Sequence, residues 1–106
     1  MQDDNEPERR FLVIVRGDKP SQTTTTAKSV MDTLSRMSRG KAQLAFSSAD
    51  ASVVGVFAKM AKPTPVIRAA LEEASTYKDR GFVLVLELGA DFAAIGNSSG
   101  WQWLQH

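Results

Sequence analysis

Two segments of this chain share one arrangement, and this internal repeat constrains its fold more than any other feature. In each segment a helix-like stretch ends at Arg-Gly and a strand-like stretch follows within two residues. The first reads SRGKAQLAF around Gly40, and the second reads DRGFVLVLEL around Gly81. Such a repeat is what two β-α-β halves of one domain produce. The 106 residues suffice for one domain with a single hydrophobic core.

Four stretches have the composition of β-strands. Residues 11–15 (FLVIV) form a short, β-branched apolar run, which favours a buried strand. Residues 41–48 and 52–60 alternate around the turn-forming SADA and predict a hairpin, and residues 82–88 (FVLVLEL) form the fourth strand. Gly55 lies inside the third stretch and predicts a bulge or the close approach of a bulky neighbour.

Two stretches have the period of amphipathic helices. The first is expected between an N-cap at Ser21 and a left-handed stop at Gly40. The second is expected to have Thr64 as its cap, Pro65 at its first position and Gly81 as its stop. The hydroxyls of threonines in the first helix are expected to bond back to helix carbonyls. The apolar faces consist of Ala27, Val30, Met31, Leu34 and Met37, and of Val66, Ile67, Ala70, Leu71 and Ala74.

The resulting order, β-α-β-β-α-β, predicts an α+β fold of the ferredoxin-like sandwich type. In that fold a four-stranded antiparallel sheet carries both helices on one face. We expect a polar leader at residues 1–10, the ferredoxin-like domain at 11–89, and a C-terminal extension at 90–106. The extension contains a short turn or a hairpin strand and packs on the sheet or on a partner subunit.

The strands at 11–15 and 82–88 are apolar on both faces, whereas a sheet covered on one side should alternate. We therefore expect the helices to cover one face of the sheet and another segment or subunit to cover the second face. Trp101 and Trp103 of the extension point to the same side of a strand, and with Leu104 they are the candidate interface residues. Two alternatives stay open, because the extension covers either its own sheet or a second copy. We expect a homodimer that forms through the sheet or the C-terminal strand.

The composition narrows the chemistry. The chain has no cysteine, and its one histidine is His106, which excludes thiol chemistry and argues against a histidine-based site. No metal or cofactor is expected. The net charge of +1 does not favour nucleic acid as a partner, although residues 16–41 hold six basic and two acidic side chains. No apolar run is long enough for a membrane span, and residues 1–10 lack the pattern of a signal peptide, so we expect a cytoplasmic protein.

The polar segment RGDKPSQTTTT, which follows the first strand, holds the candidate binding residues. A helix N-terminus attracts anions, and the neighbouring cations and hydroxyls would add to such a pocket. The alternative is a plain turn in which Gly17 breaks the strand, Pro20 stiffens the loop and the next residue caps the helix. The candidate binding residues are Arg16, Asp18, Lys19, Ser21 and Thr23.

Two resemblances offer alternative functions. The chain is similar in topology, size and the presence of Asp18 to the small dimeric ferredoxin-like nucleases of CRISPR systems and to related toxin ribonucleases. That resemblance implies a metal-dependent nuclease in which two copies of Asp18, the one catalytic candidate, share a metal across a dimer axis. The segment RGDKPSQTTTTAKSV resembles the strand-loop-helix turn of ACT-like ligand-sensing domains, with Pro20-Ser21 where they have Pro-Gly. The leading hypothesis is a small, non-enzymatic, homodimeric interaction module that binds itself or another protein.

Overall fold

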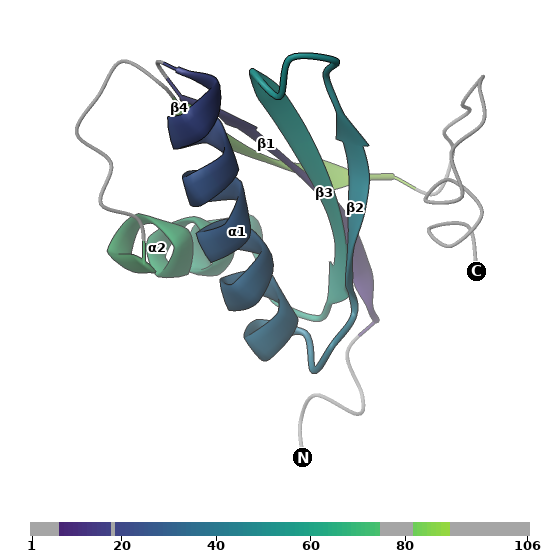
Figure 1. Ribbon diagram of the computed structural model, residues 1–106. Coiled ribbons are helices and arrows are strands. Elements are labelled where there is room, and N and C mark those ends of the chain that lie inside the picture. Colours follow the sequence, from purple (N-terminus) through teal and green to yellow (C-terminus); the bar gives the residue numbers. More distant parts are fainter. Residues whose placement is uncertain (1–6, 18, 75–81, 90–106) are drawn as a thin grey trace.

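The computed structural model describes residues 7–17, 19–74 and 82–89 (Figure 1). It has an α+β fold with four strands and two helices, as the sequence predicts. Within the described residues no helix has the length and apolar character of a membrane span. The elements in chain order are β1 (Arg9–Arg16), α1 (Pro20–Met37), β2 (Ala42–Ser47), β3 (Val53–Met60), α2 (Thr64–Ala74) and β4 (Phe82–Leu88).

The strands form one antiparallel sheet in the order β2-β3-β1-β4, so β1 and β3 are central. In β1, Val13 lies opposite Val56 of β3 and Val85 of β4, and Ile14 lies opposite Gly55 and Leu84. Because side chains alternate along a strand, these two rows point to opposite faces of the sheet.

Both helices lie on one side of the sheet, and the main core lies between them and that face (Figure 1). Phe11, Val13 and Val15 of β1 point into this core and are completely buried. We call this side the covered face and the other side the open face. The core consists of Phe11, Val13, Val15, Ala27, Val30, Leu34, Val54, Val56, Ala58, Met60, Ile67 and Leu71.

The ends of the helices match the predictions in part. The predicted N-cap at Ser21 is wrong, because α1 begins at Pro20 and its N-cap is Lys19. Pro20 suits the first helical position, where no N–H is needed, and the Lys19 N–H donates to Gln22 Oε1 at 3.1 Å. Gly40 has the predicted left-handed φ of +88°, but α1 ends earlier, at Met37, and the first left-handed residue after its C-cap is Arg39, with a φ of +58°.

The second helix, α2, has Thr64 as its first residue and Pro65 as its second, so the cap predicted at Thr64 and the first position predicted at Pro65 are each one residue too late. Its expected end at Gly81 lies outside the described residues. In the first helix the prediction of back-bonding hydroxyls is confirmed, since Thr24 Oγ1 donates to Pro20 O and Thr25 Oγ1 donates to Ser21 O, both at 3.0 Å.

The turn between β2 and β3 is held by its own side chains. Asp50 Oδ1 accepts hydrogen bonds from the Ser52 N–H and from Ser48 Oγ, both at 3.0 Å. Ser48 Oγ in turn accepts from the Val53 N–H at 3.0 Å. The hydrogen bonds from Ser52, and then that from Ser48, lower the pKa of the Asp50 carboxyl below its usual value of 3.8. The turn therefore favours the ionised form of Asp50.

Candidate functional site

The turn between β1 and α1 is organised around the hydroxyl of Thr23. Thr23 is fully buried, and its Oγ1 accepts a hydrogen bond from the Gly17 N–H at 2.8 Å. The same hydroxyl lies 3.1 Å from Ser52 O, to which it donates. Thr23 thus joins the first turn of α1 to the end of β1 and to the β2–β3 turn.

Gly17 is required at this turn by close packing. A Cβ at Gly17 would lie 2.8 Å from the Thr23 backbone nitrogen, which cannot move aside without shifting the helix. The N–H of Gly17 is bonded to Thr23 and that of Lys19 to Gln22. These two amides of the loop before α1 are therefore already used within the protein and are not available to an anion.

The predicted binding residues differ in their exposure to solvent. Arg16, Lys19 and Ser21 are exposed, and Thr23 is buried. Asp18 lies outside the described residues, so the nuclease resemblance that depends on it stays a prediction. In residues 7–17, 19–74 and 82–89 there is no group of three or more His, Cys, Asp or Glu residues that could hold a metal ion.

The open face of the sheet exposes large apolar side chains along β4. Phe82, Leu84 and Leu86 are 44%, 44% and 38% exposed. Leu84 and Leu86 lie opposite Ile14 and Leu12 of β1, which are only partly buried. We call these five residues the open-face patch. The predicted interface residues Trp101, Trp103 and Leu104 lie outside the described residues.

The other half of the open face lies over β3 and β2, and there Phe46 is 37% exposed. Phe57 is fully buried there and packs with Ala45. The ring of Phe46 lies against Gly55 so closely that a Cβ on Gly55 would overlap it. A register shift between Leu44 and Phe46 lies opposite Gly55. The close approach of a bulky neighbour is thus confirmed, and the irregularity lies in β2 rather than in the strand of Gly55. The position of Phe46 follows from this shift, which has no local signal in the sequence.

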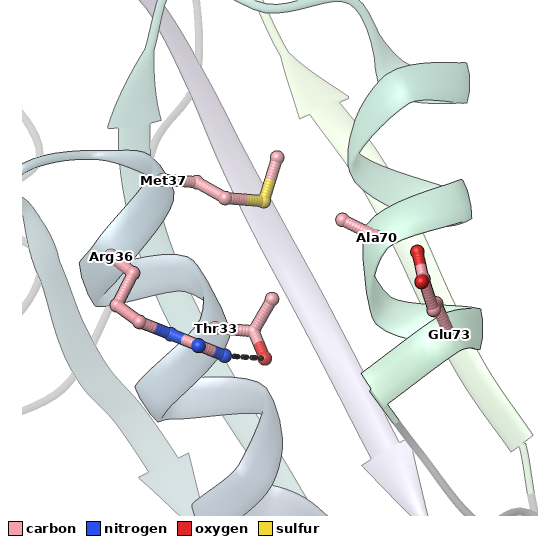
Figure 2. A pocket seen from close by; sticks show the side chains of 5 residues that line it. All are labelled: Thr33, Arg36, Met37, Ala70 and Glu73. Atoms are coloured by element: carbon pink, nitrogen blue, oxygen red, sulfur yellow. Dashed lines mark hydrogen bonds between the residues drawn. The ribbon is translucent and has the colours of Figure 1, made fainter.

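A groove of about 470 Å³ lies between α1 and α2 (Figure 2). In Figure 2 the thioether of Met37 extends from α1 toward Ala70 of α2, and Glu73 projects from α2. Arg36 on the α1 side donates from Nη2 to Thr33 Oγ1 at 3.3 Å. The groove thus has an apolar floor and charges of opposite sign on its two helices. The helical periods indicated Met37 and Ala70 as apolar positions, but the width of the groove depends on how the helices pack.

Of these surfaces, the open-face patch is the one whose residue types are unexpected at the surface of a soluble domain. Contiguous exposed apolar side chains mark contact sites more often than chance exposure does. Its side chains offer apolar contact area, which suits recognition rather than covalent chemistry. Comparisons of the chain with family models, curated proteins and solved structures gave no match.

Proposed function

We propose that this protein is a ferredoxin-like interaction module that forms a homodimer through the open-face patch. The assignment to the ferredoxin-like class is supported by the antiparallel sheet with β1 and β3 at its centre and by the two helices on one side. The observation that carries the functional proposal is the exposure of Phe82, Leu84 and Leu86 on the face that the helices leave open.

A second copy of the chain is the occupant that suits this patch best. All five members of the patch are apolar, so the patch contains no charge that would call for an opposite charge on a partner. A two-fold interface brings the same patch of both subunits together, and an apolar patch is complementary to itself in that arrangement. Two sheets stacked in this way interdigitate their side chains at a spacing of about 10 Å.

The geometry of the β1–α1 turn also favours an interaction module over a ligand sensor. A ligand-sensing turn would present backbone amides to its ligand. Here the Gly17 N–H is bonded to Thr23, and the Lys19 N–H is bonded to Gln22. The open-face patch, by contrast, has side chains that gain from burial against another surface.

Light scattering of the full chain tests this proposal. The wild-type protein is expected to show twice the chain mass of 11.6 kDa. Leu84→Glu places a charge in the patch and is expected to yield a folded monomer, because burying an unpaired carboxylate is costly. Val66→Glu is the matched control, since Val66 is 46% exposed on α2, away from the patch, and this variant should remain dimeric.

Two results would contradict the proposal. The first is a wild-type protein that stays monomeric at every concentration measured. The second is a Leu84→Glu variant that remains as dimeric as Val66→Glu while circular dichroism shows that both are folded. In that case the subunits meet through a different surface.

A further inference from the structure

A small pocket lies at the end of the sheet opposite the β1–α1 turn. It has a volume of about 200 Å³ and forms where the α1–β2 connection, the end of β3 and the residue before β1 meet (Figure 1). One acidic residue, Glu8, lines it. The basic residues that line it are Arg39, Lys41, Lys59 and Lys62.

Ser38, one of the residues that line the pocket, carries a buried hydroxyl. Ser38 is 5% exposed, and within the described part of the chain its Oγ is a buried atom with no hydrogen-bond partner. Buried polar side-chain atoms are bonded in the large majority of cases, so this hydroxyl points to a partner from outside the chain. A hydroxyl beside several cations is a set of donors that suits an oxygen-bearing anion.

The ion pair at the rim shows that a carboxylate already sits against this cluster. The Glu8 carboxylate lies 2.6 Å from Lys41 Nζ, and the side chains of Glu8 and Lys41 are 43% and 56% exposed. An exposed pair of this kind contributes little to stability, so another anion can replace Glu8 at low cost. The C-terminal end of α1 carries a partial negative charge that repels an anion. The attraction of the four basic residues has to exceed this repulsion.

We propose that this pocket binds a compact oxyanion of the phosphate class. Arg39, Lys41 and Lys62 supply the charge, and a rotation of the Ser38 side chain lets its hydroxyl donate a hydrogen bond to an oxygen of the anion. The pocket is smaller than the roughly 300–1,000 Å³ of sites for drug-sized ligands, which fits a phosphate group rather than a whole nucleotide. None of the residues that line this pocket belongs to the open-face patch, so phosphate binding and dimerisation can be tested independently.

A titration of the full chain with inorganic phosphate, followed by amide chemical shifts in NMR, tests the site. The amides of residues 38–41 and 62 are expected to shift and saturate with phosphate, and not with sodium chloride at the same ionic strength. Ser38→Ala is expected to weaken binding about tenfold, as the loss of a hydrogen bond to a charged group does. Glu8→Gln should tighten binding severalfold, because it removes the competing carboxylate.

Two controls separate a loss of binding from a loss of structure. Lys28→Gln removes an exposed lysine of α1 outside the pocket and should leave the phosphate affinity within about twofold of wild type. Ser38→Ala without phosphate should melt no lower than wild type, because it removes a buried hydroxyl that has no partner in the described part of the chain.

The proposal is overturned if phosphate and chloride give the same unsaturated shifts. It is equally overturned if Ser38→Ala and Lys28→Gln weaken binding to the same extent. A parallel titration with glycerol phosphate identifies the source of the group. Tighter binding than with inorganic phosphate points to a phosphate ester, and weaker binding points to free phosphate.

Discussion

The two faces of the sheet are built from similar residues but differ in what packs on them. On the covered face, Phe11, Val13 and Val15 of β1 are completely buried by the two helices. On the open face, Phe82 and Leu84 of β4 are both 44% exposed. Apolar side chains on a strand therefore identify a contact surface, and only the fold shows whether the contact is made within the chain. The open face is where this protein has contact area left over.

Truncating a phenylalanine on each face tests this difference. Phe11→Ala is expected to lower the free energy of unfolding by about 3–5 kcal/mol, because it opens a cavity in the core. Phe82→Ala should cost the monomeric protein about 1 kcal/mol or less, since its side chain is already half in water. Urea unfolding at low protein concentration measures both.

The same two variants, Phe11→Ala and Phe82→Ala, also show how much association contributes to stability. At high protein concentration the cost of Phe82→Ala should rise, because association stabilises the folded state by mass action. The cost of Phe11→Ala in each protomer should change less. Equal losses for the two variants in dilute solution would show that the two faces are not different in the way described.

A second test concerns how α1 is held on the covered face. Thr23→Val keeps the shape of the side chain but leaves the Gly17 N–H and the Ser52 carbonyl without their partner. We expect a loss of about 1–3 kcal/mol in the free energy of unfolding. Thr23→Ser keeps the hydroxyl and should lose less than half as much in the same urea experiment. If both variants lost the same amount, the methyl group and not the hydroxyl would hold the turn.

The β2–β3 turn is expected to add a small dependence of stability on pH, through the carboxyl of Asp50. The pKa of Asp50 is lowered in the folded protein by hydrogen bonds from Ser52 and then Ser48. The folded state thus binds a proton less readily than the unfolded chain, so the contribution is present above the unfolded pKa of about 3.9 and is lost as the pH falls through the folded value.

NMR titration of the Asp50 side-chain carbon measures this shift. The midpoint should lie below that of an aspartate in an unstructured peptide, and Asp50→Asn should flatten the acid side of the stability profile slightly. A midpoint at or above the peptide value would contradict the hydrogen-bonded turn.

The elements could be predicted from the sequence because their signals are local. The β-branched run at 11–15 marks β1, which the sheet extends to Arg9–Arg16 by pairing Arg9 with Met60. The left-handed φ of Gly40 follows from glycine itself, whereas that of Arg39, which comes first after the helix, has no such local signal. The cap predicted at Ser21 is wrong because Pro20 and Gln22 set the start of α1 together, and no single residue carries that signal.

The surfaces were harder to predict because they depend on distant contacts. The apolar excess of β4 identified the open face, but nothing local distinguished Thr23, which is buried, from its exposed neighbour Thr24. The contact of Thr23 with Ser52 spans 29 residues. The pocket around Ser38 likewise requires Lys62 to approach from beyond β3, which only the sheet topology brings about.

The most direct test of the dimer proposal is to observe which side chains meet across the two subunits. A mixture of isotope-labelled and unlabelled wild-type chains allows intermolecular NOEs to be recorded without altering any residue. We expect intermolecular NOEs from the methyl groups of Leu12, Ile14, Leu84 and Leu86, and none from Val66 on α2. A dimer whose intermolecular NOEs arise only outside the open-face patch, or a sample with no intermolecular NOEs at millimolar concentration, would contradict the claim that this face is the subunit interface.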